Sequence, residues 1–152
     1  MREQLRIESV GSYRNANLRG LAIGIKENDM RAILKSAELM SGLVKEEAVL
    51  IPIPSKRGYA TNTLKLANLI AKKTGAEVCN ILKGKNRQSF CELKRQGVRT
   101  VDSEFFGFYL TGDIPKGKRI YLVDNVTATG QTAKNAVDLI SGNTVSVLVL
   151  AD

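Results

Sequence analysis

Residues 120–132 read IYLVDNVTATGQT, and their pattern is the strongest indication of the fold in this sequence. It begins as a short apolar run, passes through the polar pair Asp124 and Asn125, and then enters a segment of hydroxyl residues and glycine. An apolar strand that leads through a short polar loop into a helix is the repeating unit of α/β proteins. The stretch therefore predicts a strand over 119–124 and a helix over 132–140.

The same alternation of strand and helix patterns extends along the chain. Apolar runs predict further strands at 48–54, 77–82, 105–110 and 144–150, and helical spacing of apolar residues predicts helices from 28 or 29 to 42 and over 61–74. Residues 1–27 mix short apolar pairs with glycines and are expected to be extended or irregular. The pattern predicts an α/β fold with a mainly parallel central sheet flanked by helices.

The composition fits one globular domain over residues 1–152. The chain is 43% hydrophobic and 25% charged, and its length is close to the ~150 residues of one domain. Its apolar runs are far shorter than the ~18 residues of a membrane span, and the start MREQLRIESV lacks the apolar core of a secretion signal. We therefore expect no membrane partner.

The chain contains no histidine and two cysteines. This excludes catalysis by Ser-His-Asp or Cys-His arrangements and zinc sites with histidine ligands. The cysteines are interpreted as ordinary thiols in a reducing compartment, since neither has a histidine to act as its base. A cytoplasmic location follows as an expectation.

The charge is strongly positive and locally concentrated. Lys and Arg number 23 against 15 Asp and Glu, which gives a net charge of +8. Residues 83–99, expected to form a loop, carry six of these bases and a single acid, Glu92. Such an excess favours a polyanionic partner: nucleic acid, a membrane surface or a phosphorylated small molecule. Charge alone does not select among them.

The segment after the predicted 119–124 strand has the features of a phosphate cradle. Ligands of open parallel sheets bind beyond the carboxyl ends of the strands. Free N–H groups at a helix start, the glycine Gly130 and the hydroxyls of Thr127, Thr129 and Thr132 suit a phosphate. An ordinary strand-to-helix turn with a threonine cap explains one of these residues but not the whole run.

This stretch resembles the signature of the type I phosphoribosyltransferases, in which an apolar strand, two acidic residues and a Thr/Gly loop hold the 5′-phosphate of phosphoribosyl pyrophosphate (PRPP). The resemblance implies that Asp124 and Asn125 form the catalytic pair facing the ribose hydroxyls, with Asp124 also contacting Mg²⁺. It assigns 5′-phosphate binding to Thr127, Ala128, Thr129, Gly130, Gln131 and Thr132.

Two residues depart from the family pattern. Asn125 stands where the family has a second acid, and a carboxamide supplies no negative charge to a developing ribosyl cation or a bound metal. Ala128 stands where the 6-oxopurine enzymes carry an aspartate, which disfavours hypoxanthine and guanine as acceptors. These departures predict weak turnover or binding without turnover.

Two further segments resemble parts of the same family. Residues 51–59, IPIPSKRGY, are similar to its pyrophosphate loop, which implies pyrophosphate contacts from Ser55, Lys56 and Arg57. A plain surface turn would also favour these residue types. The basic stretch resembles the flexible loop that closes over the pyrophosphate and excludes water. Its candidate contacts are Lys85, Arg87, Lys94 and Arg95.

Within the family, the order of segments is most similar to ComF-type competence and amidophosphoribosyltransferase-related proteins. The resemblance implies transfer of a phosphoribosyl group from PRPP, with Mg²⁺, to a small nitrogenous acceptor. The alternative is a non-catalytic PRPP- or nucleotide-binding protein, or a ComF-like factor in DNA uptake. Nucleic acid is not favoured, because 5% aromatic residues offer few stacking surfaces. A homodimer stays open, and the hood over the nucleobase is expected to be absent or reduced to residues 1–27.

Overall fold

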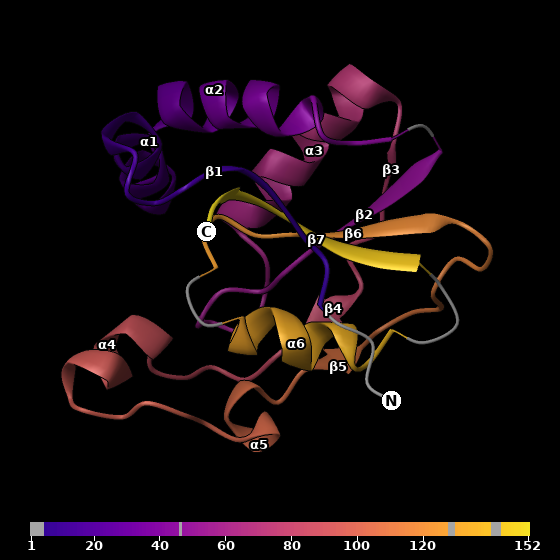
Figure 1. Ribbon diagram of the computed structural model, residues 1–152. Helices are drawn as coiled ribbons and strands as arrows, with labels where there is room; N and C mark the ends of the chain where they lie inside the picture. The colour runs from indigo at the N-terminus through magenta and orange to yellow at the C-terminus, as the bar shows by residue number, and fades with distance from the viewer. Residues whose placement is uncertain (1–4, 46, 128–129, 141–143) are drawn as a thin grey trace.

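The computed structural model describes residues 5–45, 47–127, 130–140 and 144–152. Its centre is a five-stranded sheet in the order β1-β7-β6-β2-β3, and every neighbouring pair in it is parallel (Figure 1). The strands are β1 Ile7–Gly11, β2 Ala48–Pro52, β3 Glu77–Val78, β6 Arg119–Val123 and β7 Thr144–Ala151. The predicted α/β fold with a mainly parallel sheet is confirmed.

The pairing of β2 with β6 positions the loops that follow these strands. Ala48 pairs with Arg119, and the register continues to Pro52 opposite Val123. The Ile53 N–H then donates to the Val123 carbonyl at 2.9 Å. Because the strands are parallel and end level with each other, the loop after β2 and the loop after β6 leave the same edge of the sheet.

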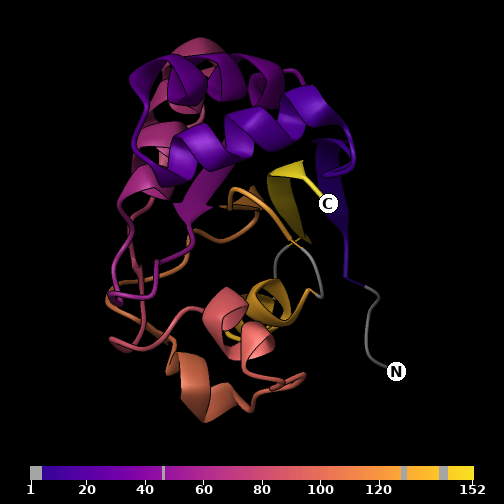
Figure 2. The same cartoon turned by 90° about the vertical axis from the view of Figure 1, so that its left-hand side faces the viewer.

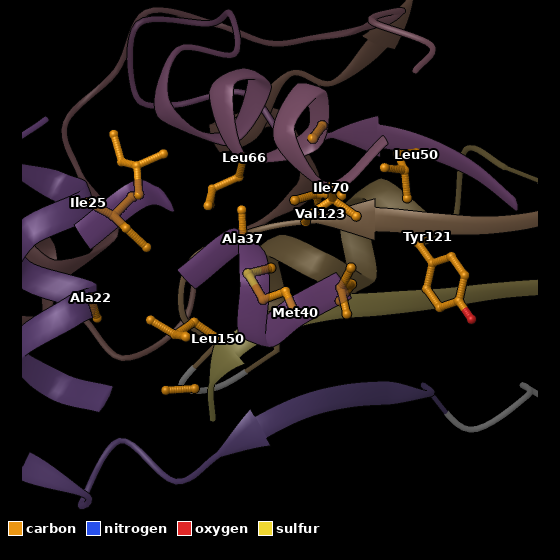
Figure 3. Close-up of a cluster of buried hydrophobic side chains, with 14 of the residues drawn as sticks. Ala22, Ile25, Ala37, Met40, Leu50, Leu66, Ile70, Tyr121, Val123 and Leu150 are labelled. Atoms are coloured by element: carbon orange, nitrogen blue, oxygen red, sulfur yellow. The ribbon is translucent and has the colours of Figure 1, made fainter. Parts of the chain in front are cut away.

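Three helices cover one face of the sheet. They are α1 Ala16–Lys26, α2 Met30–Ser41 and α3 Asn62–Thr74 (Figure 1). Side chains from these helices, among them Ile25, Met40 and Leu66, pack with Leu50 and Val123 of the strands (Figure 3). The helices predicted from 28 or 29 to 42 and over 61–74 are confirmed as α2 and α3. Asp29 caps α2, and a left-handed Gly75 ends α3.

The opposite face carries shorter elements. They are β4 Leu82–Lys83 and β5 Tyr109–Leu110, which form an antiparallel ribbon, and the helices α4 Phe90–Arg95, α5 Ser103–Phe106 and α6 Gln131–Val137. In Figure 2 α4, α5 and α6 lie on the side of the sheet away from α1 and α2. Ala133 and Ala136 of α6 pack with Ile120 and Leu122 in a second buried cluster.

The N-terminal prediction was wrong. Residues 1–27 were expected to be extended or irregular, but their described part forms β1 and α1. Asn15 caps α1, because its Oδ1 accepts the N–H groups of Asn17 and Leu18 at 3.0 and 3.2 Å. Gly24 is a close-packing residue, since a Cβ there would lie 2.5 Å from the Ala32 Cβ of α2. The reduced hood in this segment stays a prediction.

Residues 77–110 also differ from expectation. The predicted strand 77–82 is divided between β3 of the main sheet and β4 of the ribbon, and the loop expected over 83–99 contains α4. The predicted strand 105–110 begins with the last two residues of α5, and only its last two residues form β5. Asp102 Oδ1 accepts the Phe105 N–H at 3.1 Å to start α5, and a left-handed Gly107 ends it. Capping residues outweighed the strand preference of the aromatic side chains here.

Among the helices that the structure describes, none has the length and apolar character needed to span a membrane.

Candidate functional site

The loop after β2 is held by its own backbone. Both the Ser55 N–H and the Ser55 hydroxyl donate to the Tyr59 carbonyl at 3.1 Å, and the Gly58 N–H donates to the Ser55 carbonyl at 2.9 Å. Gly58 has a φ of 93°, and a Cβ there would lie 2.3 Å from the Gly84 carbonyl oxygen. The loop therefore requires glycine at 58, and it presents the side chains of Lys56 and Arg57 to solvent.

The first part of the basic stretch is fastened to this loop. The Arg87 N–H donates to the Lys56 carbonyl at 2.7 Å, and the Lys85 N–H donates to the Phe106 carbonyl at 2.9 Å. The Arg87 guanidinium lies over the rings of Phe105 and Phe106, 5.0 and 4.8 Å from their centroids. Arg87 is thus a fixed cation beside the loop.

An open pocket of about 460 Å³ lies between the two segments. Its lining residues are Lys56, Arg57, Tyr59, Asn86, Arg87, Gln88 and Glu92. Lys56 Nζ lies 3.4 Å from Glu92 Oε1. Of the described lining residues three are basic and one is acidic, so the pocket suits an anion.

Asp124 stands directly after β6. Its N–H donates to the Leu148 carbonyl of β7 at 3.0 Å, and its Oδ1 accepts the Asn125 N–H at 2.8 Å. Burial raises the pKa of the Asp124 carboxyl to about 6, while the Asn125 hydrogen bond and the charge of Arg87 act in the opposite direction. Burial likewise lowers the pKa of Arg87, and the Asp124 charge partly offsets this. The charges of Asp124 and Arg87 therefore interact, and each favours the charged form of the other.

Asn125 is tied to the helical layer. Its Nδ2 donates to the Ala22 carbonyl of α1 at 2.9 Å, and its backbone carbonyl accepts the Leu150 N–H at 3.0 Å. Its Oδ1 is buried without a hydrogen-bond partner among the described residues. The carboxamide nitrogen is thus already engaged with α1 and the side-chain oxygen is buried, so the contact of Asn125 with ribose hydroxyls stays a prediction.

The predicted phosphate cradle is described in part. Thr127 is buried and its N–H donates to the Ala151 carbonyl at 3.1 Å. Gly130 precedes α6 with a left-handed φ of 77°. Gln131 and Thr132 open that helix, and Gln131 Oε1 accepts the Val101 N–H at 3.3 Å. Ala128 and Thr129 lie outside the described residues.

The structure separates the sequence-predicted cations into two groups. Lys56, Arg57 and Arg87 line one pocket, whereas Lys94 and Arg95 are exposed on α4 and Lys85 is exposed beside the pocket. Sequence reasoning did not assign Tyr59, Asn86, Gln88 or Glu92 to the site. Their positions within or next to the two predicted loops were the feature of the sequence that could have assigned them to the pocket.

Comparisons with known proteins give one relative in sequence. No protein-family model matches the chain. Over 98 residues the chain is 30% identical to a Methanocella arvoryzae protein named transcriptional regulator GfcR. The match covers 62% of this chain and 44% of that protein, so the chain spans less than half the length of this relative.

Solved structures with a similar backbone include adenine phosphoribosyltransferases. The adenine phosphoribosyltransferase of Thermoanaerobacter pseudethanolicus superposes with a TM-score of 0.50 and 18% identity, over 80% of this chain and 67% of that one. An allosteric regulatory enzyme of purine biosynthesis gives a TM-score of 0.49 with 21% identity, over 77% of this chain and 25% of that one. The likeness to the adenine enzyme establishes a phosphoribosyltransferase fold.

Proposed function

We propose that the chain binds PRPP at the carboxyl edge of β2 and β6 and transfers its phosphoribosyl group to a small nitrogenous acceptor, releasing pyrophosphate. One observation carries the proposal: the level, parallel ends of β2 and β6 bring two loops suited to anions to one edge of the sheet. Asp124 stands at this edge and senses the charge of Arg87 in the basic pocket. The phosphoribosyltransferase fold supports the same assignment.

In this proposal the protein acts by positioning and by charge. The start of α6 with Gly130 takes the 5′-phosphate, because first-turn N–H groups have no partners within the helix. Lys56, Arg57 and Arg87 take the pyrophosphate through charge-assisted hydrogen bonds. The Asp124 carboxylate holds a ribose hydroxyl and stabilises positive charge that develops on the sugar. Such a reaction needs no protein nucleophile.

The residues at this edge suit an Mg²⁺ ion that is bound mainly by the substrate and water and only in part by the protein. No cluster of three or more His, Cys, Asp or Glu side chains occurs among the residues that the structure describes. Asp124 is the carboxylate placed at the edge, so Mg²⁺ would be held by Asp124 together with oxygens of PRPP and water, an arrangement that this ion favours. Bound there, Mg²⁺ supplies charge neutralisation to the departing pyrophosphate.

Titration calorimetry of PRPP with Mg²⁺ tests the proposed site. We expect Gly130→Val to weaken PRPP binding about tenfold or more, since a valine at this φ distorts the start of α6. Gly117→Val is the matched control, because Gly117 has a similar φ of 73° in an exposed turn with open space around it. Equal PRPP affinity in the wild type and Gly130→Val would refute the site.

A second candidate is a sensor that binds PRPP without turnover. Two observations favour it: the relative is named a transcriptional regulator, and Asn125 both lacks the charge of an acid and donates its amide to α1. Closeness to ComF-type proteins also remains a proposal. Pyrophosphate release from Mg-PRPP with adenine, hypoxanthine, guanine, xanthine, uracil and orotate separates the candidates. Turnover with any acceptor supports the transferase, and PRPP binding without turnover supports the sensor.

A further inference from the structure

Glu92 is the acidic exception in the basic pocket. Of the described residues that line the pocket, Glu92 alone is acidic, and its carboxylate is paired with Lys56 at 3.4 Å. The two side chains are 45% and 51% exposed, so water and solutes reach the pair. The Glu92 carboxylate therefore occupies the position beside Lys56 that the proposed function assigns to an oxygen of the pyrophosphate group.

Glu92 also has a second partner within its own helix. Residues 89–92, SFCE, match the pattern of a capping box, in which the serine accepts an N–H of the first turn and the glutamate accepts the serine N–H in return. The first half is present, since Ser89 Oγ accepts the Glu92 N–H at 3.1 Å. The second hydrogen bond of the capping box is not formed: the Glu92 carboxylate is paired with Lys56, and the Ser89 N–H has no partner among the described residues.

The backbone keeps these alternatives within reach of each other. The Arg87 N–H holds the segment against the Lys56 carbonyl at 2.7 Å, five residues before Glu92. Glu92 is therefore tethered beside Lys56 at a high effective concentration. An anion that binds Lys56 must displace this carboxylate, and the displaced carboxylate finds an unused donor one helical turn away.

We propose that Glu92 is an internal competitor for Lys56 that regulates anion binding to the pocket. In the free protein Glu92 masks Lys56. When a diphosphate group binds Lys56, Glu92 moves to the Ser89 N–H and completes the cap of α4. The proposal rests on the proposed function, because it assigns the pyrophosphate group of PRPP to this pocket.

The exchange of the Ser89 amide proton, followed by NMR with inorganic pyrophosphate as the probe, tests the switch. In the wild type we expect saturating pyrophosphate to slow Ser89 exchange beyond the slowing at the control amide of Glu104. In Lys56→Met and in Glu92→Gln the Ser89 amide should be protected without ligand, since glutamine also caps. Glu92→Ala should show no protection in either state. Ser89 exchange that pyrophosphate does not change, and that Lys56→Met leaves fast, would overturn the proposal.

Calorimetry completes the test. Removing the competing charge in Glu92→Gln should tighten pyrophosphate binding about two- to fivefold, the range for an exposed ion pair. Glu104→Gln, an exposed first-turn glutamate of α5 outside the pocket lining, is the matched control and should leave affinity unchanged. Unchanged affinity in Glu92→Gln, or no pyrophosphate binding by the wild type, overturns the switch. The PRPP titrations of Gly130→Val judge the proposed function separately.

Discussion

The two faces of the sheet are covered by secondary-structure elements of different length. One face is covered by three helices of 11, 12 and 13 residues, whose apolar sides bury a continuous cluster against the strands (Figures 1 and 3). On the other face lie a seven-residue helix, two shorter helices and a ribbon whose strands have two residues each. The pocket lies between the loop after β2 and the segments of this second face, where backbone hydrogen bonds between loops replace long helices. We call the side covered by α1, α2 and α3 the thick layer, and the opposite side together with the loops of the pocket the thin layer. The thick layer supplies stability, and the thin layer carries the proposed chemistry.

A cavity in the thick layer should produce the largest loss of stability. Leu66 of α3 is fully buried in the cluster under the three helices. We expect Leu66→Ala to lower the free energy of unfolding by about 2–5 kcal/mol, measured by urea denaturation. Leu139→Ala, at a residue that is 36% exposed, is the control and should cost well under half of that. A loss below about 1 kcal/mol for Leu66→Ala would break the division of roles.

A methyl group at Gly58 tests how tightly the thin layer is held. We expect Gly58→Ala to lower the free energy of unfolding by about 1–3 kcal/mol and to weaken pyrophosphate binding, because the Cβ would meet the Gly84 carbonyl oxygen. Gly75→Ala has a similar positive φ but open space around the Cβ, so it measures the backbone strain alone. Equal losses of unfolding free energy in the two variants would show that the loop shifts to accommodate the methyl group and that its contact with Gly84 does not hold it in place.

The ionisation of Asp124 makes stability depend on pH. Its pKa rises from 3.8 to about 6 on folding, mainly by burial, so the native state binds more protons than the unfolded chain between these values. The wild type should therefore lose stability as pH rises from about 4 to about 6. Asp124→Asn removes the free-energy cost of burying the charged carboxylate, so this variant should be more stable than the wild type at pH 7.5 by about 1–2 kcal/mol.

Urea denaturation at pH 4 and pH 7.5 checks this prediction. Asp113→Asn in the exposed turn before β6 is the control and should shift neither midpoint. PRPP affinity should change in the opposite direction and increase as the pH rises through 6, because the Asp124 carboxylate forms. This pH-dependent increase in affinity should be absent in Asp124→Asn. A variant that is less stable than the wild type at pH 7.5 would contradict the burial of the charge.

Sequence reasoning succeeded where the hydrophobic period is long and uninterrupted. The patterns of α2, α3, β2, β6 and β7 are set by local spacing, and each element was predicted within a few residues. α1 was missed because Gly20 and Gly24 read as breakers, while the close contact with Ala32 that explains Gly24 is visible only in three dimensions. β4 pairs with β5 across more than twenty residues of chain, a partner that no local pattern specifies.

The candidate site divides in the same way. The two loops were predicted from their motifs, and the structure places Lys56, Arg57 and Arg87 in one pocket. The support of Arg87 by two phenylalanine rings and the pairing of Lys56 with Glu92 join segments that are 18 or more positions apart. Such contacts depend on the fold and could not be predicted from the spacing of charges. The roles of Asn125 and of residues 127–132 stay predictions.

The smallest expected effect comes from the exposed cations of the thin layer. Arg95 lies on α4 and outside the described pocket lining, so Arg95→Gln should change pyrophosphate affinity by less than about twofold, as for other screened surface charges. Arg87→Gln removes the same charge from a side chain that lies over the Phe105 and Phe106 rings and interacts electrostatically with Asp124. It should weaken affinity about tenfold, or about 1.4 kcal/mol.

Calorimetry of the two variants at low and high salt checks this contrast. The loss in Arg87→Gln should persist at high salt, because the group is partly buried, whereas any effect of Arg95→Gln should disappear. Equal losses at low salt that both vanish at high salt would mean that the whole basic stretch acts as a diffuse field. In that case the fixed position of Arg87 would contribute nothing to binding, and the thin layer would attract anions without selecting among them.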